Sequence, residues 1–176
     1  MNKLSFTPMV VGYIIKNDQV LLGLRKKVSW GLGENLVSGI GGKIGDIPGR
    51  ESETNEEALV REFEEEIGVI PIKFEEMGVV KFVFPQKPKW NSLVYVYRIT
   101  EWSGEPVETE VIKPEWYDQD KLPLELMWDD NRLWVPQVIN GEKINLEVIY
   151  SEDNKTVEEV VKISHDEKKS TAEVTL

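Results

Sequence analysis

The sequence predicts an α/β domain, because runs of branched apolar residues typical of strands flank one strongly amphipathic helical segment. The segments 8–15 and 19–26 are rich in Val, Ile and Leu, and Asn17-Asp18 between them suits a tight hairpin turn. Residues 54–67 instead repeat apolar side chains at helical spacing. A chain of 176 residues with 40% hydrophobic content is enough for one domain with a sizeable core.

The helical segment has recognisable ends. Thr54 and Glu57 form a T-x-x-E capping box, and Gly68 is a suitable C-terminal stop. The stripe that we expect to pack on the core consists of Leu59, Phe63 and Ile67.

The other elements follow in chain order. Glycine is so frequent between residues 30 and 50 that loops and close backbone approach are expected there rather than regular structure. The remaining predicted elements are strands at 73–84, 92–100 and 110–118, a short helix within 129–140, and a hairpin of 143–150 with 156–163 around 152–154. We expect one domain over residues 1–165 and a fraying polar tail over 166–176.

Composition excludes several classes of function. The formal net charge of -11 disfavours a nucleic-acid polymer or an anionic membrane as partner, and an anionic small substrate would need cations to accompany it. The absence of cysteine excludes disulfides and thiolate chemistry. The one histidine, His165, is interpreted as a solvated residue. The N-terminal segment, interrupted by Pro8, Gly12 and Lys16, lacks a signal peptide or membrane span, so a cytoplasmic protein is expected.

Three carboxylates share one stripe of the helix. Glu62, Glu65 and Glu66 lie at i, i+3 and i+4, where they repel one another. A bound divalent cation would reverse the sign of that interaction, since hard cations prefer oxygen ligands. Acidic runs on helices are more often solvated faces, so the spacing alone favours a solvent-exposed helix face over a metal site.

The wider segment resembles the signature of the Nudix hydrolases, G-x5-E-x7-R-E-U-x-E-E-x-G-U, where U is apolar. Glu53 is followed by seven residues and then by REFEEEIGV at 61–69, which completes the match. The opening glycine corresponds to Gly42, but ten residues rather than five separate it from Glu53. We infer a five-residue insertion in the loop before the helix, which a loop accommodates at small cost.

The resemblance implies an alpha-beta-alpha sandwich with a mixed sheet. The helix that carries the Nudix signature, or Nudix box, would lie on one face of the sheet, and a helix around 131–139 would lie on the other. Arg61 would pair with Glu53 to fix the loop against the helix. The expected ligands of Mg²⁺ or Mn²⁺ are Glu62, Glu65, Glu66 and the backbone carbonyl of Gly42. The implied reaction is hydrolysis of a nucleoside diphosphate linked to another group, in which metal-activated water attacks phosphorus.

Two further residues are candidates near the phosphates. Many relatives carry an additional carboxylate, which falls on Val111 here, so the adjacent Glu110 is our candidate. If Glu110 faces the other side of its strand, Glu62, Glu65 and Glu66, here called the box glutamates, act alone. Lys43 is a candidate for phosphate binding, although a solvated loop lysine fits the sequence equally well.

Over roughly residues 5–165 the sequence resembles the MutT homologues that destroy oxidised purine nucleoside triphosphates such as 8-oxo-dGTP. Their MW-x-D-D…W-x-P motif aligns with residues 127–136. The alignment gives Trp128 the role of stacking on the base and Asp130 the role of the first base-binding aspartate. Asn131 stands where the second aspartate belongs.

The same resemblance extends to three residues nearer the N-terminus. Ser38 stands in place of a base-binding asparagine, Arg25 in place of a pocket lysine, and Trp30 in place of a pocket aromatic residue. Because Ser and Asn change the hydrogen-bond donors and acceptors that face the base, the base preference could differ from that of the relatives.

Three hypotheses remain open on the sequence. The first is a nucleoside triphosphate pyrophosphohydrolase that releases a monophosphate and pyrophosphate from a small-molecule nucleotide. The second is a pyrophosphatase for another diphosphate-linked compound. The third is a catalytically silent nucleotide sensor, which the intact glutamates disfavour because a pure binder need not bear their repulsion. The sequence leaves open the base, the choice between Mg²⁺ and Mn²⁺, and the oligomeric state.

Overall fold

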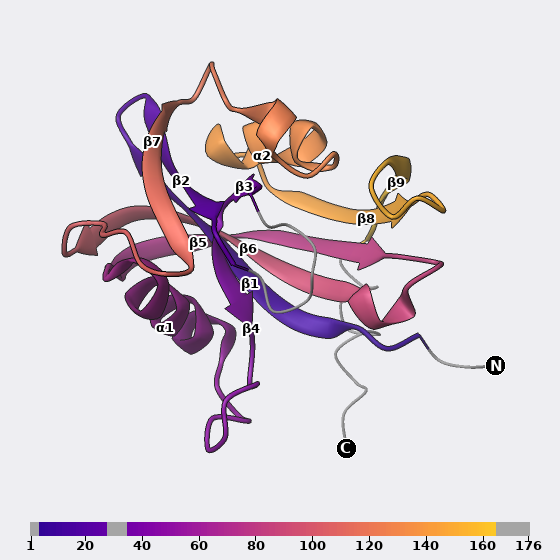
Figure 1. Cartoon of the computed structure of the whole chain (residues 1–176), viewed down its shortest axis with the longest axis horizontal. Helices are drawn as coiled ribbons and strands as arrows, with labels where there is room; N and C mark the ends of the chain where they lie inside the picture. Colours follow the sequence, from indigo (N-terminus) through magenta and orange to yellow (C-terminus); the bar gives the residue numbers. More distant parts are fainter. Residues whose placement is uncertain (1–3, 28–34, 165–176) are drawn as a thin grey trace.

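The computed structural model describes residues 4–27 and 35–164 (Figure 1), which form one mixed sheet with two α-helices. The strands are β1 (Thr7–Lys16), β2 (Gln19–Arg25), β3 (Val37–Ser38), β4 (Ile40–Lys43), β5 (Ile70–Val83), β6 (Ser92–Ser103), β7 (Ile112–Asp118), β8 (Ile144–Tyr150) and β9 (Val157–Lys162). The helices are α1 (Asn55–Ile67) and α2 (Asn131–Ile139), with short 3₁₀ turns η1 (Pro88–Trp90) and η2 (Leu124–Leu126).

The strand order is β3-β2-β1-β6-β5-β8-β9, with β4 paired to β1 and β7 paired to β2. The β1–β6 and β5–β8 pairs are parallel and the other pairs are antiparallel. Helix α1 covers one face of the sheet and α2 covers the opposite face (Figure 1). The α/β sandwich with a mixed sheet is therefore confirmed.

Strand β1 supplies side chains to both cores by simple alternation. Val10 and Ile14 belong to the core under α1, together with Phe63. Tyr13, between them, belongs to the core under α2, where its ring meets Trp134 edge-on at 6.1 Å between centroids. Strand β1 thus contributes to the packing of both helices against one sheet.

Gly12 of β1 sets how closely α1 approaches. A Cβ atom at this position would lie 2.7 Å from the Phe63 ring and 3.0 Å from Leu59. Such a contact is shorter than packed carbon atoms tolerate, so any side chain here would push α1 away from the sheet.

Helix α1 has the ends and the face that the sequence predicts. Thr54 and Glu57 make both hydrogen bonds of the capping box, and Gly68 closes the helix in the left-handed conformation at φ 70°. The three stripe residues, Leu59, Phe63 and Ile67, are fully buried. Burying each contributes about 1.5–3 kcal/mol, which fixes the rotation of the helix about its axis.

The prediction of loops throughout residues 30–50 was wrong. This stretch contains β3 and β4, and β4 pairs antiparallel with residues 9–12 of β1. A Cβ at Gly41 would lie only 2.0 Å from the Val10 carbonyl oxygen, so glycine lets the two backbones approach. Pairing with β1 outweighs the low intrinsic strand propensity of glycine.

The two predicted hairpins are present, and their turns place Asn17 (φ 54°) and Asn154 (φ 56°) in the left-handed region. Strand β5 begins at Ile70, three residues earlier than expected.

Trp30, His165 and the predicted tail lie outside the described residues. None of the helices in the described part of the chain is long and apolar enough to cross a membrane.

Candidate active site

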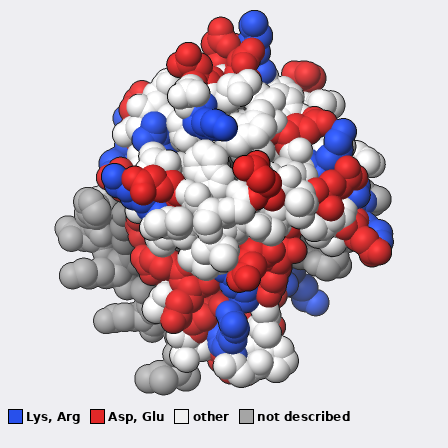
Figure 2. All heavy atoms as spheres, turned by 90° about the vertical axis from the view of Figure 1, so that its left-hand side faces the viewer, with Lys and Arg blue, Asp and Glu red and all other residues white. Residues whose placement is uncertain are grey.

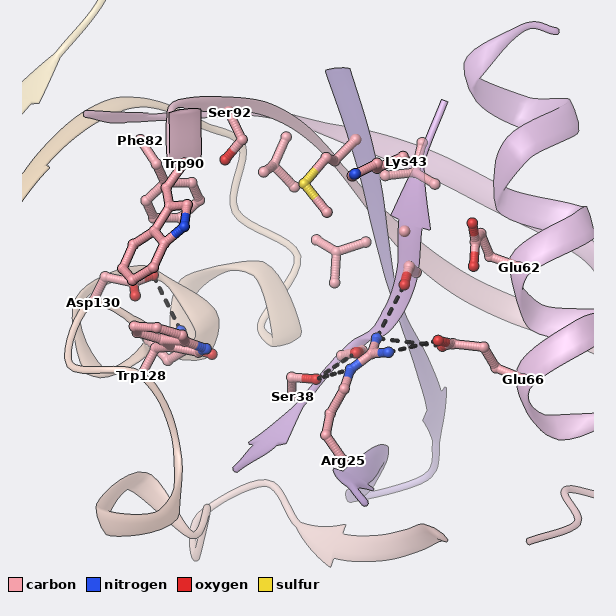
Figure 3. Close-up of a pocket in the computed structure, with 18 of the residues that line it drawn as sticks. Arg25, Ser38, Lys43, Glu62, Glu66, Phe82, Trp90, Ser92, Trp128 and Asp130 are labelled. Atoms are coloured by element: carbon pink, nitrogen blue, oxygen red, sulfur yellow. Dashed lines mark hydrogen bonds and ion pairs between the residues drawn. The ribbon is translucent and has the colours of Figure 1, made fainter. Parts of the chain in front are cut away.

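A cavity of about 710 Å³ opens beside the sheet, a size that suits a nucleotide-scale ligand. Glu62 and Glu66 of α1 border one end, next to the glycines of β4 (Figure 3). Aromatic side chains gather at the other end, namely Phe82, Phe84, Trp90, Trp128 and Tyr150. A second hollow on the outer side of α1, lined by residues such as Arg50 and Glu64, contains no aromatic side chain and offers nothing for a base to stack on.

Arg61 ties the loop after β4 to α1. Its guanidinium group donates to both Glu53 oxygens, at 2.6 and 3.0 Å, and to the Lys43 carbonyl at 2.9 Å. Glu53 also accepts the Gly45 N–H at 2.8 Å, and the arginine holds the pKa of Glu53 below its usual value. The ion pair expected between Arg61 and Glu53 is therefore present, and the longer loop does not disrupt it.

The same guanidinium reaches two box glutamates. Arg61 Nη1 lies 2.8 Å from Glu62 Oε1 and 3.3 Å from Glu65 Oε2. Glu62 is largely buried, whereas the Glu65 side chain is 54% exposed and does not line the cavity. The three carboxylates thus face different surroundings although they share one stripe.

Arg25, at the end of β2, holds the third box glutamate. Its guanidinium donates to Glu66 Oε1 at 2.6 Å and to Oε2 at 3.3 Å. It also donates to the Gly41 carbonyl at 3.0 Å and to Ser38 Oγ at 3.3 Å (Figure 3). Arg25 and Ser38, both predicted as substrate-binding residues, line the cavity and contact each other.

Because the cavity carboxylates are buried, a nearby positive charge stabilises their ionised form. Burial raises the pKa of Glu62 to about 7, against the opposing effect of Arg61. Burial likewise raises the pKa of Glu66, against the opposing effect of Arg25. Figure 2 shows many acidic side chains in the lower part of the face where α1 lies. Their negative charge attracts cations to this part of the surface.

The donor set at this end suits a hard divalent cation. Carboxylate and carbonyl oxygens are the ligands that Mg²⁺ and Mn²⁺ prefer, and Glu62, Glu65, Glu66 and the Gly42 carbonyl are the candidates. A Cβ at Gly42 would lie 2.4 Å from Glu62 Oε1, so the β4 backbone meets this carboxylate with no side chain between them. Among the described residues no three acidic, histidine or cysteine side chains are gathered around one point. Each box glutamate instead contacts a guanidinium group.

At the aromatic end, one buried carboxylate organises its neighbours. Asp130, only 2% exposed, accepts hydrogen bonds from Trp134 Nε1 at 2.6 Å, Asn131 Nδ2 at 3.1 Å and the Tyr150 hydroxyl. Burial raises its pKa. Most of the accepting capacity of Asp130 is therefore used inside the protein, which leaves the Asn131 amide as the more available polar group of the pair.

Trp128 lies on the cavity wall, as a base-stacking residue should. Its ring meets Tyr150 edge-on at 6.1 Å, and Tyr150 stacks on Phe84 at 4.5 Å with an interplanar angle of 11°. Sequence reasoning missed Trp90, Phe84 and Tyr150, which line the same wall. A tryptophan inside an otherwise polar loop, "PQKPKWN", was the one available signal for Trp90.

Glu110, the candidate for an additional carboxylate, is not brought to the cavity. The Glu110 side chain is 90% exposed, pairs with Lys27 at 3.4 Å and does not line the cavity, whereas its neighbour Val111 does. The structure therefore gives no additional carboxylate at Glu110. Lys43 lines the cavity, and Trp30 lies outside the described residues.

Residues 6–138 match the NUDIX domain family, which is more than half of the chain. The chain belongs to the Nudix family. A zebrafish (Danio rerio) oxidized purine nucleoside triphosphate hydrolase is 32% identical over 130 residues, covering 74% of this chain and 78% of the relative. An 8-oxo-dGTP diphosphatase of Escherichia coli is 28% identical over 103 residues, covering 58% and 74%.

Among solved structures, a MutT protein from Bacillus halodurans superposes with a TM-score of 0.70, covering 89% of this chain and 97% of that one at 22% identity. This match shows the same fold. Together the relatives place the chain in the MutT and oxidized purine nucleoside triphosphate hydrolase branch, as a Nudix pyrophosphohydrolase.

Proposed function

We propose that this Nudix hydrolase cleaves a nucleoside triphosphate, with an oxidised purine such as 8-oxo-dGTP as the first candidate, to a monophosphate and pyrophosphate. The observation that carries the proposal is the two-ended cavity. Carboxylates and glycine backbone border one end, and a wall of aromatic rings borders the other. A nucleotide has the same polarity, with phosphates at one end and a stacking base at the other.

At the acidic end, Glu62, Glu65 and Glu66 and the Gly42 carbonyl would hold Mg²⁺ or Mn²⁺. Bound dications would neutralise the negative charge that develops on the phosphate oxygens. Arg61 and Glu53 keep the glycine-rich backbone against α1, so this chain supplies a fixed frame for the reacting phosphate. Lys43 and Arg25 border the cavity as candidate partners for phosphate oxygens.

At the aromatic end, Trp128 would stack on the base. Asn131 and Ser38 would contact its polar edge, and both differ from the residues that the resemblance leads one to expect. This difference makes the preferred base the open part of the proposal, because an amide offers both a donor and an acceptor where a carboxylate offers acceptors alone.

A nucleotide panel tests the proposal. The purified protein is incubated with Mg²⁺ and each of the four deoxynucleoside triphosphates, 8-oxo-dGTP, a nucleotide sugar and a dinucleotide, and pyrophosphate and monophosphate are quantified. Pyrophosphate release from at least one triphosphate supports the proposal. Cleavage of the nucleotide sugar or dinucleotide alone would assign the second hypothesis instead. Tight nucleotide binding without any cleavage would identify a nucleotide sensor.

A further inference from the structure

Arg25 connects the two ends of the cavity. Figure 3 shows its side chain reaching from β2 between Ser38, on the base side, and Glu66, on the metal side. The side chains of Arg25 and Glu66 are 21% and 12% exposed, so water screens their interaction only partly. This contact is therefore stronger than a surface ion pair.

The guanidinium contacts one of the expected metal ligands, Glu66. It donates to both carboxylate oxygens of Glu66 and to the carbonyl oxygen of Gly41, the residue before the expected ligand Gly42. A carboxylate that accepts a two-pronged guanidinium has fewer lone pairs left for a cation, and the positive charge of the arginine repels one. Arg25 and a dication therefore compete for Glu66.

The second arginine of the site is anchored differently. Arg61 is held by Glu53, whose side chain is 3% exposed, and by the Lys43 carbonyl, in addition to its contacts with Glu62 and Glu65. Arg25 has one carboxylate partner in the described part of the chain, Glu66, and its other contacts are to a hydroxyl and a carbonyl. Arg25 is thus the arginine whose release costs fewer charged contacts.

We infer that Arg25 is a positioning residue that holds Glu66 in the metal-free enzyme and weakens divalent-cation binding there. The inference rests on the proposed function in so far as the box glutamates are the metal ligands. Mg²⁺ generally binds through one or two carboxylates plus substrate phosphates. An enzyme whose Glu66 is held by Arg25 takes up its cation mainly together with the nucleotide, whose phosphates give the arginine a second anionic partner.

The test is Mn²⁺ binding to the nucleotide-free, full-length protein, measured by electron paramagnetic resonance of free Mn²⁺ and by isothermal titration calorimetry. Arg25→Met keeps much of the apolar stem and removes the guanidinium, and we expect Mn²⁺ to bind about tenfold more tightly. Arg25→Lys keeps the charge but loses the two-pronged geometry, so an intermediate affinity is expected. Lys27→Met is the matched control, because it removes a cavity-lining cation that pairs with Glu110 rather than with a box glutamate.

A double variant separates a direct contact from general electrostatics. In a Glu66→Gln background, Arg25→Met should tighten Mn²⁺ binding much less, because the carboxylate for which the two cations compete is gone and only the charge repulsion is relieved. Unchanged or weaker binding in Arg25→Met would overturn the inference. So would a gain in Lys27→Met equal to that in Arg25→Met, or a gain from Arg25→Met that is undiminished without Glu66.

Circular dichroism and thermal unfolding show which variants are folded. If Arg25→Met does not fold, Arg25→Lys decides, since tighter Mn²⁺ binding than in the wild type supports the inference and equal binding overturns it. No nucleotide is present in the titration. Failure of this inference is therefore distinguishable from failure of the proposed hydrolysis, which the nucleotide panel tests alone.

Discussion

At one end of the cavity, acidic side chains from a single helix meet two arginines, whereas at the other end aromatic side chains from separate elements surround one buried carboxylate. The acidic end depends on ion pairs such as Arg25–Glu66 and Arg61–Glu62, which a cation can replace. The aromatic end depends on Asp130, whose hydrogen bonds to Trp134 and Tyr150 are internal to the fold. We therefore expect changes at the acidic end to alter turnover and changes at the aromatic end to alter nucleotide affinity and stability.

The largest effect is expected for Glu66→Gln at the acidic end. The substitution keeps the shape of the side chain but removes the charge that would bind a dication, so kcat should fall by about 10²–10³. Thermal unfolding should change little. Glu64→Gln, an exposed residue on the same helix, is the control and should retain wild-type turnover. Equal turnover in both variants would place the reaction elsewhere.

Trp128→Leu at the aromatic end should raise KM about tenfold and change kcat far less, because a stacking surface for the base is lost while an apolar side chain remains. Steady-state kinetics with the preferred nucleotide measure both constants. Trp102→Leu is the matched control, since Trp102 packs against Trp116 and does not line the cavity. A fall in kcat with unchanged KM in Trp128→Leu would contradict the division of roles between the two ends.

Tyr150→Phe should lower the free energy of unfolding by about 1 kcal/mol, because Asp130 loses one of its donors in a buried site. The ring that stacks on Phe84 is retained, so packing should be unchanged. Urea unfolding measures the difference. Tyr117→Phe removes a hydroxyl that donates to the half-buried Glu115, which also pairs with Lys113, and should be nearly neutral. Identical stabilities for the two variants would show that the Asp130 network contributes nothing.

The smallest effect is expected outside both ends, in the β8–β9 hairpin. Asp153 accepts the Thr156 hydroxyl at 2.6 Å and the backbone N–H groups of Thr156 and Lys155 at 2.8 and 2.7 Å, and these bonds hold its pKa below the ordinary value. A carboxyl with a depressed folded pKa stabilises the protein above its unfolded pKa of about 3.9 and loses this contribution as the pH falls through the folded pKa.

Asp153→Asn should therefore lower the thermal midpoint slightly at pH 7, and the gap to the wild type should narrow below about pH 4. Turnover should be unchanged, because Asp153 does not line the cavity. Thermal unfolding at several pH values measures the gap. A gap that widens on acidification would contradict the sign of the shift.

The two ends also differ in how much of them the sequence could predict. Glu62, Glu65 and Glu66 share a stripe because helical geometry is local, and the buried Leu59 fixes which way that stripe faces. The contact of Arg25 with Glu66 joins positions 41 residues apart and depends on how β2 lies against α1. A local sequence pattern does not indicate a contact between residues so far apart in the chain.

The aromatic wall was predictable only through its motif. Trp128 and Asp130 fall within the segment that resembles known relatives, whereas Trp90 and Tyr150 come from η1 and β8 and reach the same cavity wall only in the folded protein. Strand β4 was missed for a similar reason. Its glycines have low strand propensity, and the partner that makes it a strand is β1, some thirty residues earlier, at Met9–Gly12.

The most direct test of the account follows one triphosphate to its products, with Mg²⁺ and then with excess chelator, by phosphorus nuclear magnetic resonance. We predict monophosphate and pyrophosphate in equal amounts with Mg²⁺, and intact triphosphate with the chelator. Cleavage should resume when Mg²⁺ is added back in excess of the chelator. Release of orthophosphate would contradict cleavage to monophosphate and pyrophosphate, and cleavage that continues in the chelator would contradict a dication-dependent reaction at the glutamates of α1.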